Sequence, residues 1–219
     1  MSSSSGKFTE VNWADYSKVE IRYEIALYQF EHECKLLRVR FGGSYGYGSD
    51  GNGDAVYMDA MYRAAFEVLR PDGLILDFSE LGYQWGDLLG RVLNAPDQWS
   101  ERERPPFAVV LGAASEEGVR SLLLNDLGWS ADELTWAFNE PLAAQAYVED
   151  VMRECCAALH QRIETERHNQ ARSFWQLLGS DIGPEQCRSE GCHRLRVKNS
   201  GLCREHHYER VRQEPCPFK

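Results

Sequence analysis

Three cysteines and one histidine near the end of the chain carry the clearest chemistry in the sequence. Their spacing is C-x4-C-x10-C-x2-H, and the residues are Cys187, Cys192, Cys203 and His206. Thiolate and imidazole are soft ligands that suit the tetrahedral coordination of zinc. Four protein ligands leave no open position for a substrate, so we expect one structural zinc ion and not a catalytic metal.

The ligand set stays open at two positions. His207 follows His206 directly and could replace it, and Cys216 offers a further thiol. The i, i+3 spacing of Cys203 and His206 places both side chains on one side of a helix start. The segment 187–210 resembles the small treble-clef-like zinc fingers, in which the sequence Gly-Leu-Cys-x-x-His opens a helix.

The glycine-rich segment 42–53 is a second candidate site. It holds six glycines and one G-x-G-x-x-G pattern, which is a weak dinucleotide-binding signature. Asp50 and Asp54 place negative charge where a pyrophosphate would bind, and the segment has no Lys or Arg. We therefore expect a mobile loop and no cofactor-binding residues. Its two tyrosines, Tyr45 and Tyr47, are candidates for contact with a partner protein.

Other reactive side chains form no recognisable catalytic group in the sequence. Residues 31–33 (Glu-His-Glu) fall in an expected hairpin turn, where side chains splay apart, so we interpret them as solvated. Asp77 ends an expected strand and is interpreted as a cap for backbone amides. Cys155 and Cys156 are neighbours on an expected helix and are interpreted as packing thiols. We expect no catalytic residues and no enzymatic activity.

The elements that position these residues begin with a hairpin. Residues 19–30 alternate apolar and polar side chains and 34–41 are largely apolar, which predicts two antiparallel strands. Helical spacing predicts a helix over 54–69. Its apolar stripe would consist of Val56, Ala60, Met61, Ala64 and Val68. Continuous apolar runs at 73–81 and 107–113 predict strands that are covered on both faces.

Helices are expected over 86–95 and 115–127. Residues 130–133 fit a capping box or a short turn, and 135–138 fit a short strand. A last helix is expected over 141–178, with a possible break. Its apolar face would consist of Val148, Met152, Cys155, Leu159 and Ile163. This order predicts an α/β fold: a mostly parallel sheet with an antiparallel edge hairpin, a long C-terminal helix and a small zinc-finger module.

Residues 17–155 resemble STAS domains, the fold of anti-sigma-factor antagonists and of sulfate-transporter tails. The resemblance rests on the order of elements, on strand 73–81 with its Leu-Asp-x-Ser sequence, and on the Phe-Asn-Glu-Pro-Leu-Ala-Ala sequence that starts at Phe138. It implies a regulatory domain that binds other proteins. The regulatory serine of the family corresponds to Gly86 here, so the resemblance implies no phosphorylation switch at this position.

The predicted domains are an irregular N-terminus (1–16), the STAS-like domain (17–155), a connecting helix (156–182) and the zinc-finger module (183–219). No apolar run is long enough to span a membrane, and the first residues lack the apolar core of a signal peptide. We therefore expect a cytoplasmic protein without membrane contact.

Charge is distributed unevenly. Residues 1–180 carry 16 Lys and Arg against 28 Asp and Glu, a net charge of −12, and residues 181–219 carry 8 against 6, a net charge of +2. An acidic body disfavours nucleic acid and suits a basic protein partner. Nucleic acid could be bound only by the tail, which offers Arg194, Arg196 and Lys198.

The sequence as a whole predicts a non-catalytic protein that binds and regulates another protein. Three alternatives stay open. The first is an immunity or antitoxin-like inhibitor of a basic toxin enzyme. The second is a nucleotide- or acyl-CoA-binding enzyme that uses the glycine-rich segment. The third is a nucleic-acid-binding protein that uses the zinc-finger tail.

Overall fold

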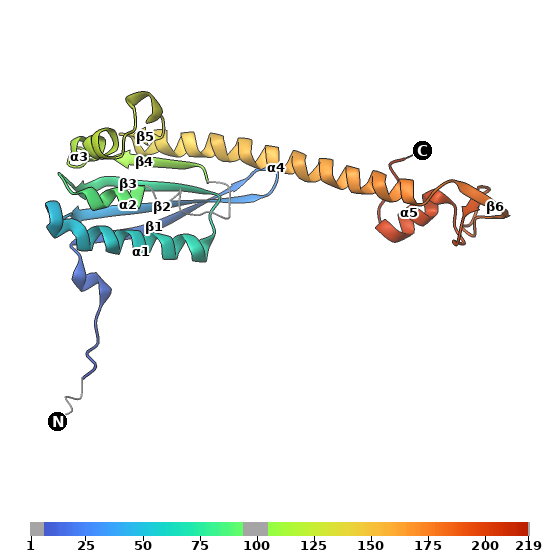
Figure 1. Cartoon of the computed structure of the whole chain (residues 1–219), viewed down its shortest axis with the longest axis horizontal. Coiled ribbons are helices and arrows are strands. Elements are labelled where there is room, and N and C mark those ends of the chain that lie inside the picture. The colour runs from blue at the N-terminus through green and yellow to red at the C-terminus, as the bar shows by residue number, and fades with distance from the viewer. Residues whose placement is uncertain (1–6, 94–104, 219) are drawn as a thin grey trace. The chain divides into compact units, whose positions relative to one another are not determined.

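The computed structural model describes residues 7–93 and 105–218 and divides the chain into two compact units, Met1–Ala157 and Ala158–Lys219 (Figure 1). The first unit is an α/β structure built on one sheet, and the second contains a two-stranded sheet and a short helix. Helix α4 (Pro141–Leu177) contributes residues to both units. No helix in the described ranges has the length and apolar character needed to cross a membrane.

The sheet of the first unit contains five strands in sequence order. They are β1 (Val19–Gln29), β2 (Glu33–Ser44), β3 (Gly73–Gly82), β4 (Phe107–Leu111) and β5 (Ala137–Phe138). Strands β1 and β2 are antiparallel, whereas β2, β3, β4 and β5 pair in parallel. The predicted α/β fold class, with an antiparallel hairpin at the edge of a mostly parallel sheet, is confirmed.

The remaining elements connect these strands or form the second unit. In the first unit they are 3-10 turns at Trp13–Tyr16, Gly48–Gly51, Asp87–Leu89 and Ala131–Glu133, helices α1 (Asn52–Leu69), α2 (Gly90–Leu93) and α3 (Glu116–Ser121), and a π-helical turn at Leu122–Asp126. The second unit adds β6 (Asp181–Gln186), β7 (Leu195–Val197) and α5 (Arg204–Arg212). The predicted capping box at Ser130 is present. The last two residues of the helix predicted over 86–95 lie outside the described ranges.

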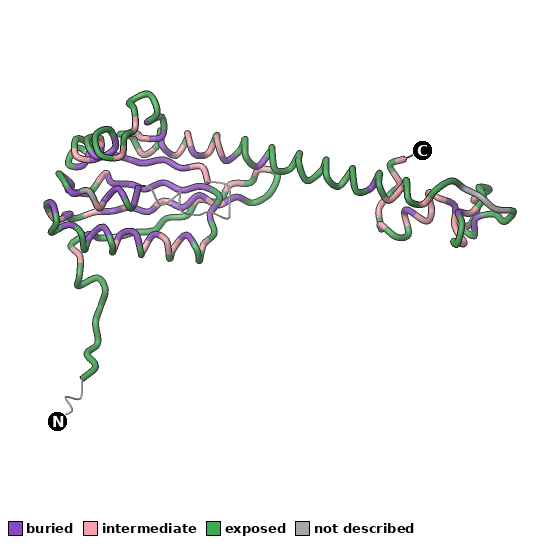
Figure 2. Tube along the Cα trace, viewed as in Figure 1, coloured by how far each residue is buried: buried purple, intermediate pink, exposed green. Residues whose placement is uncertain are grey.

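The central strands are buried along most of their length (Figure 2), and apolar residues on both of their faces belong to core clusters. On one face, Leu74 and Leu76 of β3 belong to the larger core, which α1, α2 and α3 complete. On the other face, Ile75 packs with Val148 and Met152 of α4. Because alternate residues of β3 enter both cores, the strand has the continuous apolar sequence that predicted it.

Helix α1 buries a different face from the one predicted. Its buried residues are Ala55, Met58, Asp59, Tyr62 and Phe66, together with Asp54 in the first turn. Val56 and Val68 of the predicted stripe are exposed. A tyrosine and a phenylalanine bury more apolar area than valine or alanine, so they take the side that faces the core. Asp59 can lie there because Arg63 and Arg91 bind its carboxylate at 2.5 and 2.7 Å.

The glycine-rich segment is more ordered than the predicted mobile loop. Strand β2 occupies its first residues, and a 3-10 turn leads directly into α1. The carboxylate of Asp54 accepts hydrogen bonds from the Gly46 N–H at 2.8 Å and from the Ser17 hydroxyl at 2.6 Å. The Gly48 N–H donates to the carbonyl of Trp85 at 3.0 Å. These two glycine amides therefore stabilise the fold and are not directed at a phosphate.

Helix α4 is continuous and lacks the break considered in the sequence analysis. The helix face that packs on the sheet differs from the prediction at Cys155. The buried row is Ala144, Val148, Met152 and Cys156. These residues are spaced by four and form one line along the helix surface. Cys155 is exposed. Leu159 and Ile163 are exposed as well, because all residues from 157 to 170 lie outside the core of the first unit.

Gly112 joins the carboxyl ends of β3 and β4. A Cβ atom on Gly112 would lie 2.1 Å from the backbone oxygen of Ser79. The buried hydroxyl of Ser115 accepts a hydrogen bond from the Gly112 N–H at 3.0 Å and donates one to the carbonyl of Phe78 at 2.9 Å. Ser115 precedes α3 but makes no capping hydrogen bond there, because its side chain links the two strands instead.

We predict that Gly112→Ala lowers the free energy of unfolding by about 2 kcal/mol or more, because two strand backbones must move apart. Gly53→Ala is the matched control, since nothing lies within 4 Å of its Cβ position in α1. That change should stabilise the protein by less than about 1 kcal/mol. Urea unfolding followed by circular dichroism measures both effects. Equal losses in the two variants would contradict the proposed contact at Gly112.

Candidate functional site

Four side chains of the second unit converge on one point. The Sγ atoms of Cys187, Cys192 and Cys203 and a ring nitrogen of His206 all lie within 4.8 Å of one another. His206 Nδ1 lies 3.3 Å from Cys187 Sγ and 3.4 Å from Cys203 Sγ. The Sγ atoms of Cys192 and Cys203 are 3.8 Å apart. Tetrahedral zinc bonds would separate two sulfurs by about 3.8 Å and sulfur from nitrogen by about 3.5 Å. These four residues can therefore hold a metal ion.

Backbone hydrogen bonds place the ligands. The N–H of Cys187 donates to the carbonyl of Arg194 at 2.9 Å, and the N–H of Cys192 donates to the carbonyl of Ser189 at 3.1 Å, which closes the turn between the first two cysteines. Cys203 is the N-cap residue of α5, so the histidine three residues later lies in the first helical turn and faces the same side. The predicted helix start after the third cysteine is confirmed.

The two alternative ligands contact other groups. His207 Nδ1 lies 2.7 Å from the hydroxyl oxygen of Ser200, and the thiol of Cys216 donates to the carbonyl of Phe218 at 3.3 Å. Neither belongs to the cluster of four ligand atoms among the described residues. The geometry therefore favours His206 as the nitrogen ligand.

The thiols of the cluster differ in acidity without a metal. Burial, followed by hydrogen bonding among the cysteines, raises the pKa of Cys203 to about 12. Burial also acts to raise the pKa of Cys187, but hydrogen bonds from the Cys203 backbone, the His206 ring and the Ser189 backbone lower it to about 6. Cation binding would remove the remaining thiol protons, because thiolate is the form that binds metal.

An aromatic cluster supports the metal-ligand cluster within the second unit. Its rings belong to Phe174, Trp175, Tyr208 and Phe218. Tyr208 is fully buried, and its hydroxyl donates to Glu214 at 2.8 Å. The guanidinium of Arg204 lies 3.9 Å from the ring centroid of Trp175 and donates to its backbone carbonyl. The second unit therefore has a small apolar core that includes the end of α4.

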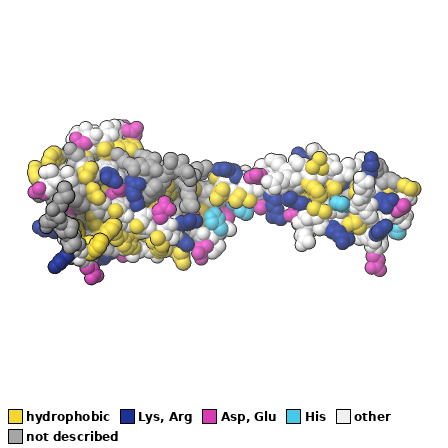
Figure 3. Space-filling view, turned by 60° about the horizontal axis from the view of Figure 1, so that its bottom comes forward, with side chains coloured by type: hydrophobic (Ala, Val, Ile, Leu, Met, Phe, Trp, Pro, Cys, Tyr) yellow, Lys and Arg dark blue, Asp and Glu magenta, His cyan; other side chains and the backbone are white. Residues whose placement is uncertain are grey.

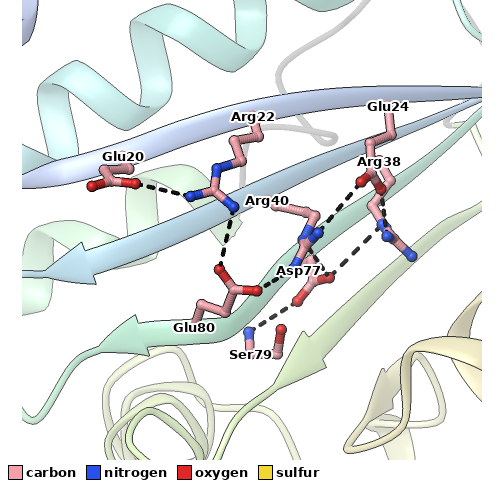
Figure 4. Close-up of polar contacts among 8 residues, drawn as sticks. All are labelled: Glu20, Arg22, Glu24, Arg38, Arg40, Asp77, Ser79 and Glu80. Atoms are coloured by element: carbon pink, nitrogen blue, oxygen red, sulfur yellow. Dashed lines mark hydrogen bonds and ion pairs between the residues drawn. The ribbon is translucent and has the colours of Figure 1, made fainter.

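A charged network lies on the sheet of the first unit (Figure 4). Its centre is Asp77, which is only 2% exposed. One carboxylate oxygen accepts the N–H of Ser79 at 2.9 Å, and the other lies 3.8 Å from the Nε atoms of Arg38 and Arg40. Neither Nε has a hydrogen-bond partner among the described residues. Asp77 binds a backbone amide as predicted, but it lies within β3 and not at a strand end, and the sequence does not predict the two arginines beside it.

The outer part of the network is more exposed. Glu24 pairs with both Arg38 and Arg40, and Arg40 also pairs with Glu80. Arg22 lies between Glu20 at 3.1 Å and Glu80 at 3.9 Å. The network contains three arginines and four carboxylates, so each arginine on this part of the sheet is paired within the chain. The positive charges of this network are balanced by its own carboxylates, which is not the composition of an anion-binding site.

Two aromatic rings are exposed at the carboxyl ends of β2 and β3. Tyr47 and Trp85 are 68% and 51% exposed, and their ring centroids lie 5.6 Å apart. Gly48 positions the pair, because it has φ of +59° and a Cβ there would lie 2.7 Å from the Trp85 ring. Of the two tyrosines predicted for partner contact, only Tyr47 is exposed. Tyr45 is buried and packs edge-on against Tyr83.

The basic side chains predicted for nucleic-acid contact are partly paired. Arg194 forms an ion pair with Glu205, and Arg196 pairs with Glu185 at 2.6 Å. Figure 3 shows positive and negative side chains interspersed on the face of the second unit that it displays. This distribution does not favour a phosphate backbone as ligand.

A second cluster joins residues from distant parts of the chain. His32, Cys34 and Cys156 each place a ligand atom within 4.8 Å of the others. The two sulfur atoms lie 2.8 Å apart, although 122 positions separate them in sequence. The sequence alone favours a solvated turn residue at His32 and a packing thiol at Cys156. Only tertiary packing brings them together, so no local signal could have revealed the cluster.

We predict that Asp77→Asn lowers the free energy of unfolding by about 1–3 kcal/mol, because it leaves two guanidinium groups without their central anion. Both arginines are about a quarter exposed, which keeps the loss below that of a fully buried pair. Glu20→Gln is the control, since Glu20 is 70% exposed and should contribute less than about 0.5 kcal/mol. Urea unfolding measures both. A larger loss from the control would contradict the central role of Asp77.

Comparisons with known proteins give little further identification. No family model matches the sequence, and no curated protein matches it. Among solved structures, the crystal structure of an anti-sigma factor antagonist from Mycobacterium paratuberculosis is similar, with a TM-score of 0.40 and 16% identity. The similarity covers 59% of this chain and 95% of that chain.

Proposed function

We propose that this chain is a non-catalytic regulatory protein that binds another protein through its first unit and carries one structural zinc ion in its second. The observation that carries the binding role is the exposed pair Tyr47 and Trp85 at the carboxyl edge of the sheet. Tryptophan and tyrosine dominate binding hot spots, because each buries a large area with few rotatable bonds.

The position of this pair also supports a ligand-binding role. Loops at the carboxyl ends of parallel strands are the usual binding sites of open α/β sheets. Both rings follow such ends, and the Gly48 N–H fixes one loop to the other through the carbonyl of Trp85. A pre-ordered aromatic pair loses little conformational freedom when a partner covers it.

The resemblance to STAS domains supports the regulatory part of the proposal. It rests on element order and on the sequence from Leu76 to Ser79 in β3. Gly86, which corresponds to the regulatory serine of that family, directly follows Trp85. The aromatic pair therefore lies beside the position at which the family regulates binding, although this chain has no hydroxyl there to phosphorylate.

The chemistry of the cluster in the second unit supports zinc as the ion. Three thiolates and one imidazole are a common structural zinc set, and the interatomic distances suit tetrahedral bonds. The unit is small, and units of this size commonly need a metal or disulfide in addition to an apolar core. We infer that the ion stabilises the unit and takes no part in a reaction.

We predict one zinc ion per purified chain. Cys192→Ser should weaken zinc binding at least about 100-fold, because it removes one of the four protein ligands and opens a coordination position. His207→Ala is the matched control and should retain the ion, since His207 contacts Ser200. Competition with a chelating dye measures the affinity. Zinc loss in the control with retention in Cys192→Ser would contradict the assigned ligands.

We predict that the Tyr47→Ala, Trp85→Ala double variant loses at least about tenfold in affinity for the partner. Partners are first captured from the source cells with the wild-type chain and identified by mass spectrometry. Binding of each purified candidate is then measured by calorimetry. Phe8→Ala is the control, because Phe8 is an exposed aromatic residue outside the pair.

Two results would contradict the proposed function. One is a partner whose affinity is unchanged in the double variant and reduced in the control. The other is turnover of a substrate by the purified chain that a point change in the first unit abolishes. Both variants must keep the wild-type circular dichroism spectrum, so that loss of binding is not loss of fold.

A further inference from the structure

The contact between Cys34 and Cys156 connects the beginning of β2 to helix α4. Their sulfur atoms lie 2.8 Å apart, well inside van der Waals contact. Cys34 is fully buried and Cys156 is 6% exposed, and both belong to the core that α4 forms with the sheet. A disulfide needs a separation of about 2.05 Å, so the sulfurs would have to approach by only about 0.8 Å.

An exposed histidine adjoins the pair. His32 Nε2 lies 3.8 Å from Cys156 Sγ, and the thiol of Cys34 donates to the backbone carbonyl of His32 at 3.7 Å. The imidazole can accept the thiol proton of Cys156 and so produce the thiolate, which is the reactive form of cysteine. Because His32 lies at the surface and Cys34 is fully buried, Cys156 is the sulfur that a small oxidant meets first.

We propose that Cys34 and Cys156 form a reversible disulfide in response to a peroxide, with His32 as the base that activates Cys156. The oxidised bond would fasten α4 to the first strand of the parallel part of the sheet. This inference does not depend on the proposed partner or on the zinc site, because all three residues lie in the first unit.

The reaction balances with hydrogen peroxide as the oxidant. The Cys156 thiol gives its proton to His32, and the thiolate sulfur attacks one peroxide oxygen. The O–O bond breaks, and the departing hydroxide takes the proton as water, which leaves a sulfenic acid on Cys156. The Cys34 sulfur then attacks the Cys156 sulfur. The S–O bond breaks, and its hydroxyl leaves as a second water with the Cys34 proton. Two electrons pass from the two thiols to one peroxide.

The environment of Cys34 disfavours direct reaction of this sulfur with the peroxide. Burial, followed by the hydrogen bond with Cys156, raises the pKa of Cys34 to about 12. Asp72 and Glu31 add to this effect through their negative charge. Cys34 therefore stays protonated while Cys156 reacts with the peroxide, and it gives up its proton only as the S–S bond forms, so the two sulfurs have different roles.

The disulfide would stabilise the protein mainly by restricting the unfolded chain and would change the folded structure little. It would close a loop of more than 100 residues, which restricts the unfolded ensemble strongly. The native sulfurs are already in contact, so the fold would need little rearrangement. Oxidation should therefore raise the melting temperature of the first unit by roughly 5–10 °C.

The test uses the full chain loaded with zinc. The protein is treated with a limited excess of hydrogen peroxide, alkylated, digested without reduction and analysed by mass spectrometry. We expect a peptide pair linked through Cys34 and Cys156 that dithiothreitol separates again. Differential scanning calorimetry on the same samples should show the rise in melting temperature and its reversal.

Matched variants assign the roles. Cys155→Ala should leave the linkage unchanged, because Cys155 lies on the exposed side of α4. Cys34→Ala should abolish the linkage and leave a sulfenic acid on Cys156 that dimedone traps. His32→Gln should slow formation of the linkage at least roughly tenfold without changing the melting temperature of the reduced protein.

Three outcomes would overturn the proposal. The first is oxidation of Cys156 in the wild-type chain without linkage to Cys34. The second is linkage that involves mainly Cys155 or the cysteines of the second unit. The third is a second equivalent of zinc that is lost with Cys34→Ala, which would make the cluster a metal site instead. The wild-type digest decides the first two outcomes without any variant.

Discussion

Packing of α4 on one face of the sheet is the constraint on which the first unit depends. Along β2 and β3 the side chains on that face are apolar where α4 contacts them, at Leu36 and Ile75. They become charged further along the same strands, at Arg40 and Asp77, which are partners in the sheet register. In β2 the change comes at Arg38, whose register partner in β3 is still the apolar Ile75, and in β3 it comes one pair later, at Asp77. The charged network therefore occupies the part of this sheet face that lies beyond the contacts with α4.

The other face follows from the same arrangement. The crossover helices α1, α2 and α3 contribute to the core on the face opposite α4, because right-handed crossovers between strands in sequence order all lie on one side of the sheet. The aromatic pair at the carboxyl edge then occupies loops that neither helical layer covers fully, as the exposed fractions of Tyr47 and Trp85 show. Packing of the helices thus separates a rigid interior from a small accessible edge at which binding is proposed.

Element order and most strand positions could be predicted because they depend on local apolar patterns. The convergence of Cys187, Cys192, Cys203 and His206 could be predicted for a similar reason, since these four residues lie within twenty positions of each other. The buried face of α1 could not, because Tyr62 and Phe66 outweigh a regular stripe of smaller residues. The ion pairs of Asp77 and the contact of Cys34 with Cys156 join distant segments. Their formation depends on sheet register and on helix packing, which sequence periodicity does not encode.

Helix α4 belongs to two cores at once. Its first turns supply Val148 and Met152 to the sheet, and its last turns supply Phe174 and Trp175 to the aromatic cluster around Tyr208. Only the stretch from 157 to 170 is exposed along its whole length. Recombination between genes could therefore exchange one half of this protein only at a point inside α4. A breakpoint elsewhere would damage one of the two cores. Domain shuffling normally exploits loops, so the two halves are expected to have been inherited together.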